Sequence, residues 1–159
     1  MRYREIMRED SAAIAALVRT NLKAHGLDIP GTVCFDPNLD NISDFYLEAP
    51  DKRYYMVVIS DDDRIIGGIG LAEFNAFSET AELQKLYLSD EAKGRHLSYE
   101  MIGMIEEKAR TLGYRQMYLE THTNLKAAIH IYEKTGYSRI SRPESVVHGG
   151  MNRFYLKKL

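Results

Sequence analysis

The stretch from Glu82 to Ser98, which reads ELQKLYLSDEAKGRHLS, constrains this chain more than any other part of it. An apolar, strand-like run ends in a short acidic loop, and the basic turn Lys93-Gly94-Arg95 then leads into a long helical pattern. The first turn of a helix carries unpaired backbone N–H groups and partial positive charge. The arrangement therefore predicts an anion-binding turn whose natural ligand is a phosphate. The P-loop pattern of mononucleotide-binding kinases and ATPases is absent.

Length, charge and cysteine usage narrow the class of protein. A chain of 159 residues is expected to form one domain spanning residues 1–159. Its formal net charge of -2 provides no general basic field for nucleic acid, and no segment approaches the ~20 apolar residues of a membrane span. The charged N-terminus lacks the apolar segment of a signal peptide, and Cys34 is the only cysteine. We therefore expect a cytoplasmic protein without a nucleic-acid or membrane partner.

Hydrophobic periodicity and turn residues predict the order strand-helix-helix-strand-strand-strand-helix-strand-helix-strand-strand. The predicted strands are residues 3–7, 53–59, 64–74, 79–88, 116–120, 137–140 and 152–157, and the predicted helices are 11–22, 41–48, 97–112 and 125–134. Three successive strands favour antiparallel hairpins, whereas the strand-helix-strand unit over 79–120 favours one parallel, right-handed crossover. The expected fold class is therefore α/β with a mixed sheet.

Two features resemble functional motifs without matching them. Gly68-Ile69-Gly70 resembles the start of a dinucleotide-binding fingerprint, but more strand follows and the third glycine is missing. We expect these glycines to mark a bulge or a close backbone approach. The acidic turn Asp61-Asp62-Asp63 does not have the spacing of a calcium loop, so we expect a solvated turn and no metal site.

Helical spacing defines two apolar faces in the second half of the chain. The first comprises Leu97, Met101, Met104, Ile105 and Ala109. The second lies in the sequence LKAAIHIYEKTGY, where Leu125, Ala128, Ile129 and Tyr132 fall on one side of the predicted helix. Taken alone, this second pattern predicts only that Tyr132 is an aromatic of the core stripe whose hydroxyl reaches solvent. The histidines at 25, 122 and 130 carry no comparable pattern.

Together, the two stretches ELQKLYLSDEAKGRHLS and LKAAIHIYEKTGY resemble the GNAT superfamily of N-acetyltransferases. That family has a strand, an acidic loop and an Arg-Gly-x-Gly-x-Gly turn that opens a helix, followed later by an Ala-x-x-x-Tyr-Glu-Lys-x-Gly-Phe type helix. The predicted order of elements is also that of the family, and the resemblance covers nearly the whole chain. It implies a mostly antiparallel sheet with one splayed parallel pair. It also implies transfer of an acetyl group from acetyl-CoA to a primary amine, by direct attack in a ternary complex and without a metal.

The resemblance implies which residues hold the acetyl-CoA co-substrate. Leu86, Tyr87 and Leu88 would lie on a strand that splays from its neighbour and pairs with the pantetheine arm. The CoA pyrophosphate would bind at Lys93, Gly94, Arg95, His96, Leu97 and Ser98. The far side of the pantetheine channel would be lined by Asn124, Leu125 and Ala128. His96 stands where the family usually has glycine, and Ser98 stands where it usually has glycine or alanine.

The resemblance also implies two catalytic residues. Tyr132 takes the position of a tyrosine that protonates the departing CoA thiolate, and Glu82 that of a glutamate base in the histone acetyltransferase branch. An alkyl amine has a pKa of about 10.4 and must be neutral to attack, so Glu82 can accept its proton directly or through a water. The thiol pKa of about 8.5 lies below the value of about 10 for tyrosine, so Tyr132 can stabilise or protonate the leaving group.

Other interpretations stay open at this point. His96 in the glycine turn also fits a catalytically degenerate acyl-CoA-binding sensor or scaffold, and the strand-helix-strand unit alone fits another phosphate-binding α/β module. The acceptor, a small-molecule or peptide amine, would bind between residues 23–45 and the last two strands, with His148-Gly149-Gly150 at its border. Acidic loop residues that favour a cationic acceptor are Asp28, Asp36 and Asp40. Exposed edge strands make a homodimer a reasonable hypothesis.

Overall fold

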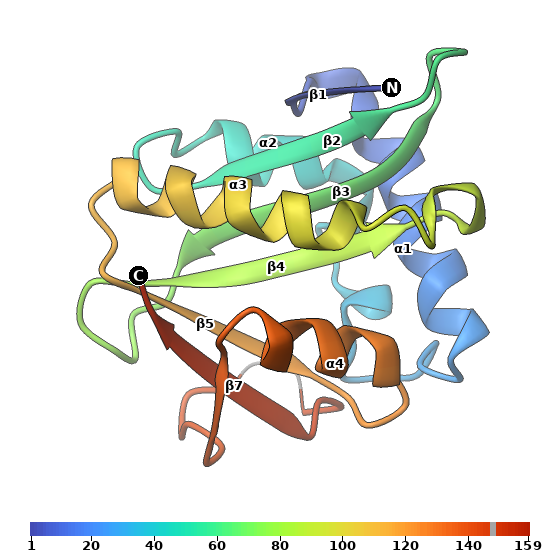
Figure 1. Ribbon diagram of the computed structural model, residues 1–159. Helices are drawn as coiled ribbons and strands as arrows, with labels where there is room; N and C mark the ends of the chain where they lie inside the picture. Colours follow the sequence, from blue (N-terminus) through green and yellow to red (C-terminus); the bar gives the residue numbers. More distant parts are fainter. Residues whose placement is uncertain (147–148) are drawn as a thin grey trace.

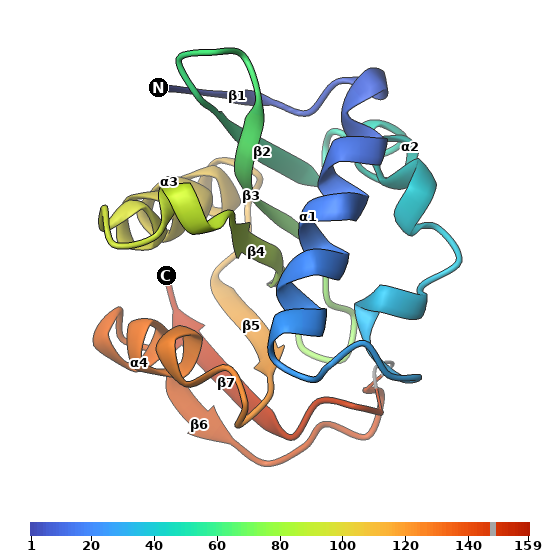
Figure 2. The same cartoon turned by 90° about the vertical axis from the view of Figure 1, so that its right-hand side faces the viewer.

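The computed structural model describes residues 1–146 and 149–159 and shows a seven-stranded sheet between two layers of helices (Figures 1 and 2). The strands are β1 (Arg2–Glu5), β2 (Tyr54–Ile59), β3 (Ile65–Glu73), β4 (Thr80–Leu88), β5 (Gln116–Thr121), β6 (Ser138–Ile140) and β7 (Arg153–Lys158). The α-helices are α1 (Ser11–Ala24), α2 (Ile42–Leu47), α3 (Leu97–Thr111) and α4 (Lys126–Lys134). The predicted fold class and order of elements are confirmed.

The sheet is mixed, with the strand order β1-β2-β3-β4-β5-β7-β6. Among the described strands, β4 and β5 form the one parallel pair, and α3 makes the crossover between them. Helices α3 and α4 cover one face of the sheet, and α1 and α2 cover the other (Figure 2). None of the helices in the described part of the chain is both long enough and apolar enough to cross a membrane.

The parallel pair separates halfway along its length. Pairing between β4 and β5 runs from Thr80↔Gln116 to Glu82↔Tyr118, although both strands continue beyond this point. From there the two ribbons diverge (Figure 1). The cause is a bulge in β4, because Gly70 pairs with Gln84 while Gly68 pairs with Tyr87, which leaves one extra residue on β4.

The bulge is held in place by a buried tyrosine and two glycines. The Tyr55 hydroxyl donates a hydrogen bond to the Lys85 carbonyl at 3.1 Å, and Lys85 itself has a positive φ of 50°. A Cβ atom at Gly68 or at Gly70 would come within 2.5 Å of the Tyr55 side chain. The close backbone approach expected at these glycines is therefore observed, opposite the bulge.

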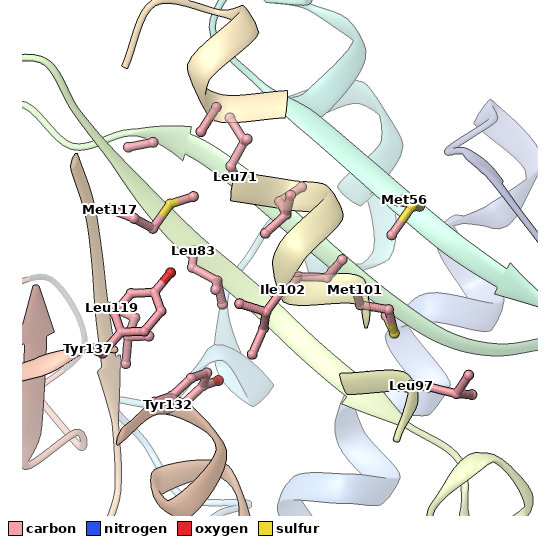
Figure 3. Packing of buried hydrophobic residues seen from close by; sticks show 14 of the residues in the cluster. Met56, Leu71, Leu83, Leu97, Met101, Ile102, Met117, Leu119, Tyr132 and Tyr137 are labelled. Carbon is pink, nitrogen blue, oxygen red and sulfur yellow. The ribbon is translucent and has the colours of Figure 1, made fainter. Parts of the chain in front are cut away.

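The main core lies between the sheet and the α3–α4 layer (Figure 3). Leu97, Met101 and Ile105 of α3 are buried there, as the helical spacing predicted. Met104 was expected on the same face but is 40% exposed, and Ile102 is buried in its place. The helix rests across several strands, so its buried face is wider than a single line of residues.

We predict that Gly70→Ala lowers the free energy of unfolding by about 1–3 kcal/mol, the usual cost of overpacking a well-packed core. The added methyl group would collide with the rings of Tyr46 and Tyr55, which are both fully buried. Urea denaturation measures the change, and Gly103→Ala is the matched control. Gly103 lies within α3, where an added Cβ atom would meet nothing within 4 Å beyond the backbone of the helix itself. This control should therefore be neutral or stabilising by up to about 1 kcal/mol. Equal stability of Gly70→Ala and the parent would contradict the prediction.

Candidate active site

Two cavities adjoin where β4 and β5 diverge. The first, of about 520 Å³, is bordered by the end of β4, the start of α3, α4 and the end of α1, and we call it the α3 cavity. The second, of about 570 Å³, is bordered by the loop before α2, the end of β3, and β4, and we call it the α2 cavity. Lys85 and Glu120 line both cavities, so these two side chains mark the gap between the strands.

Most of the predicted site residues lie together in the wall of the α3 cavity. They are Leu86, Tyr87, Leu88, Lys93, Gly94, His96, Leu97, Ser98, Leu125, Ala128 and Tyr132. Arg95 and Asn124 are outside this wall, and Glu82 lines the α2 cavity instead. The Asn124 amide donates a hydrogen bond to the His25 carbonyl at 3.0 Å, so it ties the β5–α4 loop to the end of α1.

The basic turn has the backbone geometry of an anion site. Gly94 and His96 both have positive φ, at 75° and 59°, and α3 begins immediately after them. Within the described part of the chain, the backbone N–H groups from Gly94 to Ser98 donate no hydrogen bond. Lys93 is paired with Asp90 at 2.6 Å. Glycine adopts the left-handed backbone of His96 more readily than histidine does, because it has no Cβ atom.

Tyr132 presents a protonated phenol to the α3 cavity. Its side chain is only 6% exposed, and its ring packs edge-on against Tyr137 with 6.0 Å between the centroids. Burial raises the pKa of Tyr132 above the usual value, because the charged phenolate loses its hydration. The hydroxyl therefore keeps its proton at neutral pH and can act as a hydrogen-bond donor.

Carboxylates gather on the other side of the gap. Glu82 accepts a hydrogen bond from the Gln84 amide at 3.2 Å, and the Tyr118 hydroxyl donates to Glu120 at 3.0 Å. Burial lowers the pKa of the Lys85 ammonium, while the nearby charges of Asp36 and Glu82 act in the opposite direction. Lys85 and Glu120 thus line the same cavity as the Tyr132 phenol, whereas Asp36 and Glu82 line the α2 cavity.

The expected acceptor loop contributes to the α2 cavity. Of its three acidic residues named from the sequence, Asp36 lines the cavity. Asp28 lies outside the lining, and Asp40 is paired with Arg19 at 2.7 Å, also outside it. Ser145, between β6 and β7, completes this side. His148 lies outside the described residues, but the Gly150 N–H donates to the Gly31 carbonyl at 3.0 Å, which joins the two loops.

Several residues that line the α3 cavity were not predicted from the sequence. They are Asn21, His25, Lys85, Tyr99, Glu120 and His130. Glu120 had a usable signal, because its strand runs parallel to that of Glu82 and parallel strands end at the same edge of a sheet. Glu120 follows Tyr118, the partner of Glu82, by two residues and therefore lies on the same face as Glu82. His25 had none, since only tertiary packing brings the end of α1 to this site. In residues 1–146 and 149–159, His, Cys, Asp and Glu side chains do not group in threes suited to hold a metal ion.

Comparison with known proteins agrees with this architecture. The acetyltransferase (GNAT) family pattern matches residues 16–137. The chain is 34% identical over 139 residues to the Escherichia coli protein named uncharacterized N-acetyltransferase YjgM, which covers 86% of this chain and 81% of that one.

Two solved structures show the same fold at low identity. An acetyltransferase of the GNAT family from Staphylococcus aureus superposes with a TM-score of 0.87 at 19% identity, covering 99% of this chain and 98% of its own. Spermidine N-acetyltransferase from Vibrio cholerae, in complex with CoA and spermine, has a TM-score of 0.71 at 18% identity, with coverage of 99% and 94%. On the strength of the family pattern and the Escherichia coli relative, this chain belongs to the GNAT family of acetyltransferases.

Proposed function

We propose that this protein transfers an acetyl group from acetyl-CoA to a primary amine by direct attack in a ternary complex. The observation that carries the proposal is the junction of the two cavities at the β4–β5 gap, with the basic turn and Tyr132 on one side and carboxylates on the other. One cavity can hold a thioester while the other admits an amine, so both substrates can meet at Lys85 and Glu120. The relative from Vibrio cholerae, which was crystallised with CoA and spermine, supports this pairing of ligands.

The residues of the α3 cavity suit acetyl-CoA. The N–H groups from Gly94 to Ser98, which have no acceptor among the described residues, would bind the pyrophosphate, with Lys93 and Arg95 beside them. Beyond Glu82 the β4 backbone has no partner on β5, so the edge from Leu86 to Leu88 can pair with the pantetheine amides. Leu125 and Ala128 would form the opposite wall, and Asn124 would hold that wall against α1 through its bond to His25.

Proton transfer on the two sides of the gap would complete the reaction. The acceptor amine would lose a proton to a carboxylate, and the neutral nitrogen would then attack the thioester carbonyl. Glu82 and Glu120 are the carboxylates of β4 and β5 that line the α2 cavity, and Glu120 also reaches the α3 cavity. Tyr132, which keeps its proton at neutral pH, would donate to the departing thiolate.

The proposal also includes the partners and the location of the protein. The acceptor is a small-molecule or peptide amine, the net charge of -2 does not favour nucleic acid, and the expected location is the cytoplasm.

A homodimer would form through an edge of the sheet, where the described strands are β1 and β6. Sedimentation at several protein concentrations tests this association.

We predict that Tyr132→Phe binds acetyl-CoA with an unchanged Kd but has a kcat about 100-fold lower, because the donor to the thiolate is lost. Calorimetric titration with acetyl-CoA measures the first quantity, and thiol release with a panel of amines measures the second. Tyr137→Phe removes the hydroxyl of the neighbouring buried tyrosine and should keep the parent kcat.

Two outcomes would count against this proposal. No binding of the parent protein at millimolar acetyl-CoA would overturn it, whereas binding without thiol release from any amine would favour the acyl-CoA sensor. An unchanged kcat in Tyr132→Phe would remove Tyr132 from the reaction.

We predict that Glu120→Gln lowers kcat/KM about 100-fold at pH 7, and that Glu82→Gln lowers it by only a few-fold. Glu120 lines both cavities, whereas Glu82 lines only the α2 cavity. The loss in Glu120→Gln should shrink as the pH rises towards 10, because more of the acceptor amine is then already neutral. Profiles of kcat/KM against pH for both variants measure this. A larger loss in Glu82→Gln would assign the proton transfer to Glu82.

We predict that His96→Gly keeps the parent affinity for CoA to within about threefold, because the contact is made by a backbone N–H that glycine also has. His96→Val should weaken binding and lower the thermal midpoint, since a β-branched residue resists the left-handed backbone that His96 adopts. Calorimetry and thermal denaturation of the two variants test this. Loss of CoA binding in His96→Gly would show that the imidazole itself contacts the ligand.

A further inference from the structure

Lys85 stands out among the residues at the gap. It occupies the bulge of β4 with a φ of 50°, and its carbonyl is held by the Tyr55 hydroxyl, so the start of its side chain is fixed. The side chain is half-buried and lines both cavities. Within the described part of the chain, no carboxylate oxygen lies within 4.0 Å of its ammonium, and its ammonium donates no hydrogen bond. A partly desolvated ammonium in this condition has a free position for an anionic ligand group.

The charges around Lys85 restrict which kind of molecule can supply the anionic group that it binds. The α2 cavity is also lined by the carboxylates of Asp36, Glu73, Glu82 and Glu120. Glu73 is paired with Arg53 at 2.7 Å, Glu82 accepts a hydrogen bond from Gln84, and Glu120 accepts one from Tyr118. An acceptor with net negative charge would be repelled by these carboxylates. A polyamine would suit the carboxylates but would place one of its own cations beside Lys85. A molecule with one ammonium and one carboxylate fits both kinds of charge.

The proposed reaction fixes the orientation of the acceptor in the α2 cavity. The attacking nitrogen must reach the gap, where Lys85 and Glu120 both line the two cavities. The carboxylate that binds Lys85 must therefore be close to that nitrogen along the covalent skeleton. The rest of the acceptor would extend into the α2 cavity towards Leu39, Ile42 and Phe45, whose side chains are apolar.

We propose that the acceptor is an α-amino acid, and that Lys85 is a specificity-determining residue that binds its carboxylate while Glu120 faces its amine. This inference rests on the proposed acetyl transfer and adds the chemical class of the acceptor. The contact between Lys85 and the carboxylate forms before the reaction and persists through it. Lys85 therefore affects the KM of the acceptor more than kcat.

The experiment compares matched acceptors that differ only in the carboxylate, such as leucine with isopentylamine and phenylalanine with phenethylamine. For the parent protein and for Lys85→Met, kcat and KM are measured by thiol release, and the ratio of the two proteins is taken for each acceptor. This ratio cancels the different basicities of the amines. We expect Lys85→Met to lower kcat/KM for the amino acids roughly 10- to 100-fold, mainly through KM, the usual range for a charge-assisted hydrogen bond. For the decarboxylated amines the change should stay within about threefold.

Three further measurements keep the result interpretable. Lys85→Arg should restore part of the preference for amino acids, because it restores the charge. Lys158→Met removes an exposed lysine at the end of β7 and should behave as the parent. The Kd of acetyl-CoA should be the same in all variants, which shows that the cofactor side is intact.

The outcomes separate this inference from the function it rests on. If acetyl-CoA binds and simple amines are acetylated at least as well as amino acids in both proteins, the inference is wrong while the acetyltransferase function stands. If mass spectrometry after incubation with acetyl-CoA alone finds Lys85 acetylated, Lys85 is a nucleophile and not an anchor, which also overturns it. If acetyl-CoA does not bind at all, the proposed function itself fails.

Discussion

The hydrogen bond from the Tyr55 hydroxyl to the Lys85 carbonyl fixes the place where β4 turns away from β5. A left-handed backbone at a residue with a side chain costs about 1–2 kcal/mol, so the bulge persists only where its surroundings stabilise it. Tyr55 is fully buried and packs against Gly68 and Gly70, which leave room for its ring. The gap, the unpaired edge of β4 and the junction of the two cavities all depend on this one arrangement.

The fold follows from local patterns, and for that reason the sequence predicts it well. Every predicted boundary of a helix or strand lies within two residues of the observed one, because periodicity and glycine stops act over short distances. The glycine turn and the Tyr132 helix are likewise short, continuous patterns. The residues that were missed or misassigned depend on tertiary packing. Asp36 and Asp40 are four residues apart in one loop, yet one faces the α2 cavity and the other pairs with Arg19.

Two residues of the candidate site have a left-handed backbone. Apart from glycine, the described residues with positive φ are Asp63, Glu79, Lys85 and His96. The first two lie in turns before β3 and β4, where such geometry is common. The other two line the α3 cavity, where one re-aims a strand and the other turns N–H groups outward at the start of α3. The bulge at Lys85 follows the end of the β4–β5 pairing, and the turn at His96 leaves N–H groups without an acceptor among the described residues.

The position of Lys85 also separates acceptor binding from proton transfer. A free amine is mostly protonated at pH 7 and must lose a proton before it can attack. A carboxylate bound to Lys85 would compensate the charge of the ammonium, so Lys85 would act on the binding of the acceptor and leave the proton to a carboxylate such as Glu120. Simple amines lack this contact, so their reaction would depend on Glu120 but not on Lys85. Both side chains can meet one acceptor because they line both cavities.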